Sequence, residues 1–398
     1  MNKNEIIGLD KDYIAQFYGR MNLAPVGGKN ATVIDADGAE YIDFTSGIGV
    51  NSLGVCDGNW VAAVVAQLGK IQHLSNYYYS EQTGLLAKKL VEASGMKRAF
   101  FCNSGAEANE GAIKVARKYS YDKYGEGRNV IICLTNSFHG RTLTTLAATG
   151  QDVFHQFFFP FTEGFVFVPI NDIDALKDAV NPRVCALMCE PVQGESGVNP
   201  LTVEYASALK DICEKNDLLL IFDEVQTGIG RTGEVFAFQG LGVTPDVCSL
   251  AKGLGGGLPI GAVILGEKCE STFGASHHGT TFGGNPVVAA GANEVMSRVT
   301  DPEFLQSVRE KGDYIRSKVA EWGFDTVIDV RGKGLMVGVQ VTVSHKEVAK
   351  KCLENGLMIL TAGKDVVRML PPLTITYAEI DRGLEILKKS LGEVSANA

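Results

Sequence analysis

Residues 218–224 read LLLIFDE, and residues 247–257 read VCSLAKGLGGG. The first stretch is an unbroken apolar run that ends in an acid, Asp223. The second is a weaker apolar run that ends in a base, Lys252, followed by glycines. Such runs are typical of strands buried on both faces of a largely parallel sheet. Ligands of open α/β sheets bind at the carboxyl ends of the strands, so the two stretches predict a ligand site there.

Both residues also have a plainer interpretation. Asp223 can be a capping acid at a strand–helix turn, and Lys252 a solvated lysine in a turn. The glycines after Lys252 favour close approach of the backbone to a ligand. A lysine at a ligand-facing strand end can lose its proton through burial and attack a carbonyl.

The rest of the chain alternates apolar runs with helical patterns, which predicts an α/β fold. Further strands are expected at 130–134, 165–168 and 184–188, and helices at 58–71 and 81–95. Asp37-Gly38 predicts a hairpin turn between the runs 33–36 and 40–44.

The last hundred residues change character. Asp301-Pro302-Glu303 predicts a helix start, and Thr376–Glu379 a capping box before a final helix ending near Leu391. Strand-like runs lie at 335–342 and 366–370, and a frayed tail is expected from residue 393. We expect three units: an N-terminal segment at 1–57 belonging to a small domain, a large domain at 58–290, and a small α+β domain at 291–398.

Composition excludes some classes of protein. The formal net charge is -9, which disfavours a nucleic-acid surface. The N-terminus has no apolar signal segment, and no uncharged apolar run reaches the ~18 residues that a membrane helix needs. Nine cysteines without a C-x-x-C pair indicate reduced thiols, so we expect a cytoplasmic protein without a metal site.

Two further segments complete a candidate site. Small residues at 103–109, including Gly105 and Ala106, open a helix and can present N–H groups to an anion, although ordinary capping is an alternative. Ser137–Thr142 offers an aromatic face in Phe138 and a guanidinium in Arg141, while His139 receives no role in proton transfer. A phosphate cradle, an aromatic face, an acid and a lysine are what a pyridine-aldehyde phosphate needs.

With these residues, the chain resembles the class III aminotransferases of pyridoxal-phosphate (PLP) fold type I, in the acetylornithine and ornithine aminotransferase branch. The most specific stretch is 221–262, supported by TTFGGNP at 280–286 and CEPVQGESG at 189–197. The resemblance implies a large domain with a mainly parallel seven-stranded sheet flanked by helices. A smaller α+β domain would come from both chain ends.

The resemblance also implies roles toward PLP. Lys252 would form the Schiff base and then move a proton between the substrate carbon and C4′ of the cofactor, and Asp223 would pair with the pyridinium nitrogen. The other cofactor-binding residues implied are Gly105 and Ala106 at the phosphate, Phe138 and Val225 on the ring faces, Gln226 at the 3′-oxygen, and Glu224 beside them. Thr281 would reach the phosphate of a neighbouring subunit and Thr280 its substrate, which implies a homodimer with shared sites.

Substrate residues follow in the same way. Arg141 resembles a carboxylate clamp. Glu195 would neutralise Arg368 when an ω-amino substrate binds and release it for the α-carboxylate of glutamate. An apolar residue at Ile48, where ornithine aminotransferases tend to carry Tyr, favours N-acetylornithine, with 2-oxoglutarate as acceptor in arginine biosynthesis.

Several alternatives stay open. Ornithine, N-succinyl-ornithine, N-succinyl-diaminopimelate and 4-aminobutyrate are other possible substrates, and aminomutases, racemases and decarboxylases share the fold. A nucleotide-binding protein is remote, because the spacing of Gly332-Lys333-Gly334 to Gly338 does not fit G-x-G-x-x-G.

Overall fold

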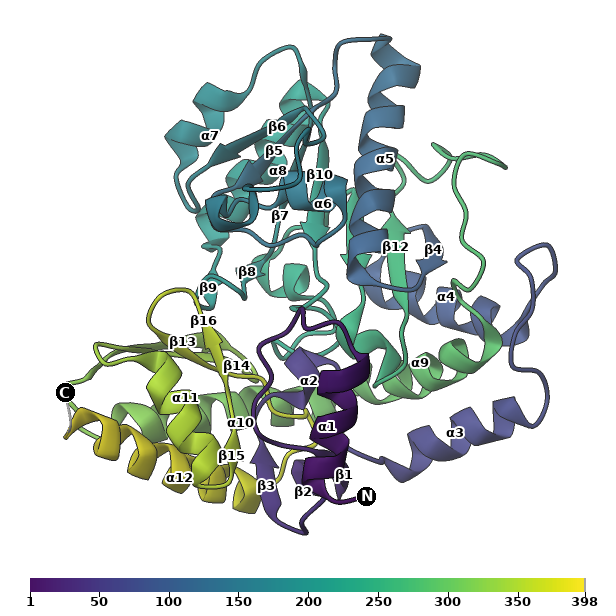
Figure 1. The fold of residues 1–398 in the computed structure, drawn as a ribbon. Coiled ribbons are helices and arrows are strands. Elements are labelled where there is room, and N and C mark those ends of the chain that lie inside the picture. Colours follow the sequence, from purple (N-terminus) through teal and green to yellow (C-terminus); the bar gives the residue numbers. More distant parts are fainter. Residues whose placement is uncertain (397–398) are drawn as a thin grey trace.

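The structure is a computed structural model that describes residues 1–396. Its largest sheet has seven strands in the order β4-β12-β11-β10-β7-β5-β6 (Figure 1). Only β12 runs antiparallel to its neighbours, which confirms the predicted mainly parallel sheet. The strands are β4 (Arg98–Cys102), β5 (Val130–Leu134), β6 (Phe165–Val168), β7 (Val184–Cys189), β10 (Leu219–Asp223), β11 (Val247–Leu250) and β12 (Gly261–Leu265).

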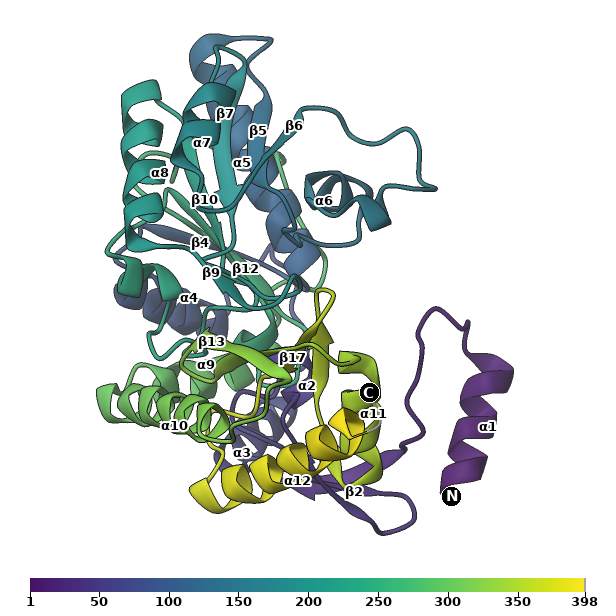
Figure 2. The same cartoon turned by 90° about the vertical axis from the view of Figure 1, so that its left-hand side faces the viewer.

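Helices cover both faces of this sheet, as Figure 2 shows. Successive residues of a strand point to opposite faces, so Ile131 packs in the cluster that holds helix α5, and Ile132 in the one that holds α7 and α8. Each face is therefore dry, which explains why the strand sequences are unbroken apolar runs. The helices of this region are α3 (Gly58–Leu68), α4 (Glu81–Ser94), α5 (Gly105–Tyr124), α6 (Leu143–Ala148), α7 (Ile173–Ala179), α8 (Val203–Asn216) and α9 (Pro286–Val299).

A second sheet joins the two ends of the chain. Its order is β1-β2-β3-β15, in which β3 pairs antiparallel with β2 and parallel with β15. The predicted turn lies between β2 and β3, where Gly38 has φ +84°. The strands are β1 (Pro25–Lys29), β2 (Thr32–Asp35), β3 (Glu40–Asp43) and β15 (Leu357–Met358).

The C-terminal part adds a third sheet, β13-β14-β17-β16, against which α10 and α11 pack. Its strands are β13 (Val327–Lys333), β14 (Met336–Val341), β16 (Leu360–Ala362) and β17 (Val366–Met369); the ribbon β8 (Val192–Gln193) and β9 (Asn199–Pro200) lies beside it. The helices are α10 (Pro302–Ala320), α11 (His345–Glu354) and α12 (Tyr377–Ser395).

The expected end of the last helix is wrong. The Thr376 capping box starts α12 as predicted, but the helix continues to Ser395. Val394 packs against the core and the hydroxyls of Ser395 and Thr326 lie 2.9 Å apart, so these contacts hold the last turn. Of the frayed tail expected at 393–398, residues 397–398 lie outside the described part.

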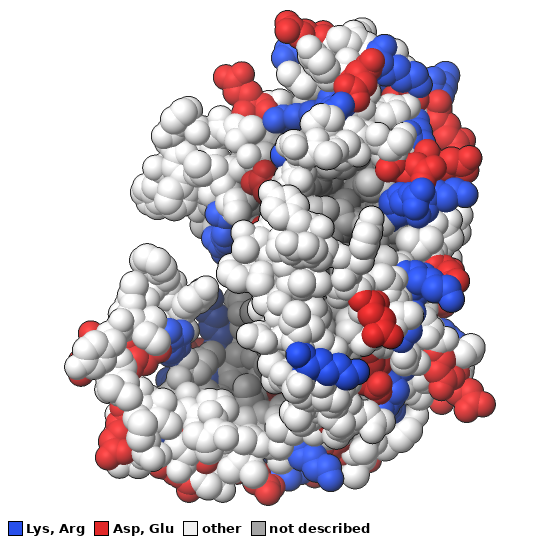
Figure 3. Space-filling view, turned by 90° about the vertical axis from the view of Figure 1, so that its right-hand side faces the viewer, with Lys and Arg blue, Asp and Glu red and all other residues white. Residues whose placement is uncertain are grey.

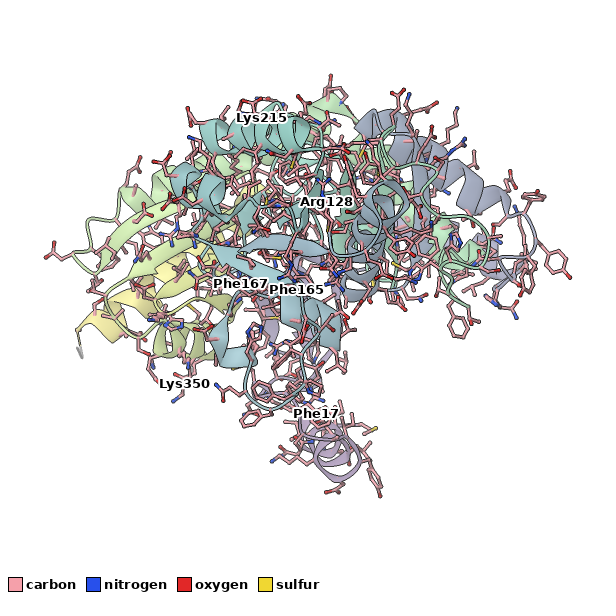
Figure 4. All side chains as sticks on the ribbon, turned by 90° about the horizontal axis from the view of Figure 1, so that it is seen from above. Phe17, Arg128, Phe165, Phe167, Lys215 and Lys350 are labelled. Atoms are coloured by element: carbon pink, nitrogen blue, oxygen red, sulfur yellow. The ribbon has the colours of Figure 1, made fainter. Side chains whose placement is uncertain are left out.

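Two segments project from the same side of the molecule. One is α1 (Lys3–Tyr13), which buries no residue, with exposed Phe17 beyond it (Figure 4). The other is the region of α6 and the loop that follows. Figure 3 shows a hollow between them, on a surface where both signs of charge are interspersed. None of the helices within residues 1–396 has the length and apolarity needed to cross a membrane.

Candidate active site

A cavity of about 650 Å³ lies at the carboxyl ends of the parallel strands. Its walls come from the residues that follow β4, β5, β7, β10 and β11, which all point to one edge of the sheet. The structure therefore brings predicted residues together at the edge of the sheet where the sequence predicts a ligand site. The predicted residues lining it are Gly105, Ala106, Phe138, Arg141, Glu195, Asp223, Val225, Gln226 and Lys252.

Asp223 is buried and accepts three hydrogen bonds. Its Oδ2 accepts hydrogen bonds from Asn109 Nδ2 at 2.7 Å and His139 Nδ1 at 2.8 Å, and its Oδ1 accepts from the Val225 N–H at 3.0 Å. The Ser249 hydroxyl in turn donates to Asn109 Oδ1 at 2.5 Å, which fixes the amide. These three donors fix the orientation of the carboxylate at the edge of the cavity. Capping of the turn through the Val225 N–H is thus only one of the three contacts of Asp223.

Lys252 opens a short 3₁₀ turn (Lys252–Gly255) after β11, with φ +36°, and its side chain lines the cavity. Burial lowers the pKa of its amine, although the acid Glu195 acts in the opposite direction. A lowered pKa increases the fraction of neutral amine, which is the form that attacks a carbonyl or takes a proton.

The N-terminus of α5 presents a ready anion site. Ser104 caps the helix by accepting from the Glu107 N–H at 3.2 Å, while the N–H groups of Gly105 and Ala106 bond to nothing within residues 1–396. A Cβ on Gly105 would lie 2.7 Å from Val225 Cγ1, so only glycine keeps this corner open. Two free N–H groups at the positive end of a 20-residue helix suit a phosphate.

Phe138 and Arg141 line the cavity, and Phe154 packs against both of them. We call these three residues the arginine–aromatic wall. The Arg141 guanidinium carbon lies 3.9 Å from the centre of the Phe154 ring and 5.3 Å from that of Phe138. The two rings meet edge to face at 6.1 Å. In the described part of the chain Arg141 makes no hydrogen bond and no ion pair, so its N–H groups are available to an anion.

A second wall is formed by Glu195, which lines the cavity and pairs with Arg368 outside the lining. Arg368 lies on β17 and is 2% exposed, and its NH1 and NH2 donate to Glu195 Oε1 and Oε2 at 2.9 and 3.3 Å. Gln226 donates to Glu195 at 3.1 Å and accepts from Arg368 at 3.2 Å. Burial acts to raise the pKa of Glu195, but Arg368 outweighs it and the pKa lies below its usual value. Glu195 is therefore ionised and masks Arg368.

Glu190 was not singled out from the sequence. Its buried carboxylate accepts from the Phe138 N–H at 2.9 Å and the Gly194 N–H at 3.4 Å, so it joins the two walls. Burial raises its pKa to about 7. Its position directly after the apolar run of β7 is the signal that could have identified it.

Besides Arg368, four predicted residues do not line this cavity. Glu224 points away, and its carboxylate accepts from the N–H groups of Ala237 and Phe238 at 2.7 and 2.8 Å, so its part is structural. Ile48 is 43% exposed and sits in a left-handed turn with φ +66°. Thr280 and Thr281 line a second cavity of about 720 Å³. The Thr280 hydroxyl accepts a hydrogen bond from the Asn103 side chain at 2.9 Å.

Comparison with known proteins agrees with this geometry. The family model of class-III aminotransferases matches residues 13–391. The acetylornithine aminotransferase of Haemophilus ducreyi is 51% identical over 397 residues, covering 99% of this chain and 100% of that protein. The succinylornithine transaminase of Photorhabdus laumondii is 42% identical, covering 95% and 96%. The ornithine aminotransferase of Toxoplasma gondii, solved with partial occupancy of PLP at its active site, superposes with a TM-score of 0.95 at 31% identity, covering 100% and 95%.

The chain belongs to the class-III aminotransferases. The cofactor of this family is pyridoxal phosphate, and the cavity fits it. The free N–H groups of Gly105 and Ala106 can take the phosphate, and the open corner at Gly105 gives the backbone access to it. The Asp223 carboxylate can hold a protonated ring nitrogen, and Lys252 lies in the same cavity to meet an aldehyde.

Proposed function

We propose that this protein transfers the terminal amino group of N-acetylornithine to 2-oxoglutarate, giving N-acetylglutamate 5-semialdehyde and glutamate. The observation that carries the proposal is the shared cavity of Lys252, whose pKa is lowered, and the masked pair Glu195–Arg368. A lysine without the pair would serve any reaction of the cofactor. The pair adds what an aminotransferase requires, namely a site that accepts two different amino substrates in turn.

When bound, PLP supplies an aldehyde that takes up the amino group and a ring that withdraws electrons from the reacting carbon. The residues of the protein place and move the protons. With PLP bound, Asp223, oriented by Asn109 and His139, would keep a proton on the ring nitrogen. The Lys252 amine would move a proton from the carbon that bears the amino group to C4′ of the cofactor.

The two arginines position the substrates. Arg141 binds the carboxylate at the far end of either substrate through a planar, two-pronged contact. Arg368 stays masked by Glu195 while the amino end of N-acetylornithine, which carries no carboxylate, reacts. It is released to bind the α-carboxylate of glutamate or 2-oxoglutarate in the other half-reaction.

N-Acetylornithine is proposed over its alternatives on two grounds. The relatives that carry this name reach 51% identity over nearly the whole chain, and Ile48 offers no polar group for a free α-amino group. Arginine biosynthesis is the corresponding pathway. N-Succinyl-ornithine is the second candidate, because a transaminase of that name is 42% identical to this chain.

We further propose a homodimer in the cytoplasm. Thr280 and Thr281 lie in a second cavity of their own chain, which suits residues that reach the phosphate and substrate of a partner. The nine cysteines, all within the described residues, are free and eight are buried, which suits a reducing compartment. The division into 1–57, 58–290 and 291–398 also remains our proposal.

A competition assay tests the activity. N-Acetylornithine, N-succinyl-ornithine, ornithine, N-succinyl-diaminopimelate and 4-aminobutyrate are offered singly with 2-oxoglutarate, and glutamate formation is measured. We expect the highest kcat/KM for N-acetylornithine. A preference for free ornithine would overturn the substrate, and absence of glutamate with every donor would overturn amino transfer.

A further inference from the structure

The arginine–aromatic wall contains one residue to which no role has been assigned. Phe154 belongs to a short 3₁₀ turn, η1 (Asp152–Phe154), and is the closest ring to Arg141, with 3.9 Å between the ring centre and the guanidinium carbon. Phe138 is farther from that carbon, at 5.3 Å. No hydrogen bond or ion pair holds Arg141 within residues 1–396, so Phe154 is its closest support.

The turn that carries Phe154 is tied firmly to the loop that carries Arg141. The Gly150 N–H donates to the Ser137 hydroxyl at 3.0 Å, and the Asn136 N–H donates to the Gly150 carbonyl at 2.6 Å. The Gln151 amide donates to the Ser137 carbonyl at 3.0 Å. A Cβ on Gly150 would overlap the carbonyl oxygen of Leu134, so the two segments approach as closely as the backbone allows. These bonds hold the backbone before Arg141 and the backbone before Phe154 side by side.

An aromatic support has a specific chemical advantage here. A ring face attracts the guanidinium without accepting its N–H donors in plane, so the donors stay free for a carboxylate. An acidic support would neutralise the cation, as Glu195 does to Arg368. Without any support, an exposed arginine would lose side-chain entropy when it bound substrate.

We propose that Phe154 is a positioning residue that holds Arg141 ready for the substrate carboxylate and so contributes to selection of carboxylated amino donors. The inference rests on the proposed function. It assigns to Phe154 an effect on substrate binding and none on the chemistry at Lys252. Its effect passes entirely through Arg141.

The test compares Phe154→Leu, which keeps an apolar side chain but removes the ring face, with Phe154→Tyr, which keeps it. The donors are N-acetylornithine and N-acetyl-1,4-diaminobutane, the same amine without the carboxylate. We expect Phe154→Leu to raise the KM for N-acetylornithine about three- to tenfold. The kcat, the cofactor absorption spectrum and kcat/KM for the decarboxylated donor should stay unchanged, and Phe154→Tyr should behave as wild type.

Arg141→Lys provides the second arm. If Phe154 acts through Arg141, the Arg141→Lys/Phe154→Leu variant should be no worse than Arg141→Lys alone. Losses that multiply in the double variant, or an equal loss with both donors, would overturn the inference. If the wild type instead prefers another donor, the proposed substrate fails. The Phe154 comparison is then made with that donor and its decarboxylated analogue, so the two failures are distinguishable.

Discussion

Arg141 is exposed and has only aromatic rings beside it, whereas Arg368 is 2% exposed and carries an acid on its guanidinium. The first cation is always available to a carboxylate. The second becomes available only when Glu195 moves away. A single cavity that binds substrates with different charge distributions needs one constant cation and one that can be switched. The two walls therefore divide the work of recognition between a fixed contact and a conditional one.

The largest effect is expected when the reactive amine of Lys252 is removed from the cavity. Lys252→Ala takes away the amine toward which both arginines orient substrate. Loss of the proton-transferring group should lower kcat by about 10³-fold or more. Stopped-flow absorbance of the cofactor with glutamate measures the half-reaction, and retained cofactor binding is the control. Turnover within about tenfold of wild type would remove the catalytic assignment.

The second-largest effect on activity is expected from a change at Glu195. Glu195→Gln keeps the shape of the side chain but leaves Arg368 unmasked, like Arg141. The half-reaction with glutamate should keep or gain affinity, while kcat/KM for N-acetylornithine should fall about tenfold or more, because an unpaired cation then faces its amino end. Glu195→Asp, which keeps the charge, is the matched control. An equal change in both single-turnover half-reactions would contradict the switch.

A smaller effect is expected from displacing the turn that carries Phe154 in the arginine–aromatic wall. Gly150→Ala forces the Phe154 turn away from the Leu134 carbonyl, which should destabilise the fold by about 1–3 kcal/mol and raise the KM for N-acetylornithine a few-fold. Gly84→Ala is the matched control, because a Cβ there meets nothing within 4 Å. Thermal melts and steady-state kinetics measure both. Equal behaviour of the two variants would show that the wall tolerates displacement.

The smallest effect concerns Glu190, which links the walls. Burial raises its pKa from 4.5 to about 7, so between these values the folded protein holds a proton that the unfolded chain has released. The free energy of unfolding therefore falls as pH rises through this window. Relative to Glu190→Gln, the Tm of the cofactor-free wild type should fall by a few degrees between about pH 5 and 8. Other titrating groups are shared by both proteins, so parallel melting curves would contradict the buried titration.

Part of the fold and two residues of the site could be predicted from the local sequence. Strands β5 and β6 have the predicted bounds. All residues of β5 are buried, and a strand covered on both faces changes composition abruptly at its ends. Asp223 and Lys252 were predictable for the same reason, since each interrupts an apolar run at its carboxyl end. The antiparallel direction of β12 was not, because strand direction is set by connections and leaves no mark on the residues themselves.

The supporting contacts could not be derived from the chain order. His139 and Asn109 are 84 and 114 residues from Asp223, and Glu195 is 173 residues from Arg368. Only resemblance to a family suggested the second pairing. Phe154 belongs to no motif, and its importance comes from a ring–guanidinium distance that exists only after folding. Partners in a polar network can be identified only after the fold brings their segments together.

The pairing of β3 with β15 has a consequence for how the chain is made. Residues 40–43 leave the ribosome more than 300 residues before their partner at 357–358. Until then the hairpin has an open edge, and such edges invite pairing with other chains. Closure of this sheet is a non-local event, which slows folding. Addition of β15 to the N-terminal hairpin is thus a late step of biosynthesis, and the edge of β3 stays open until then.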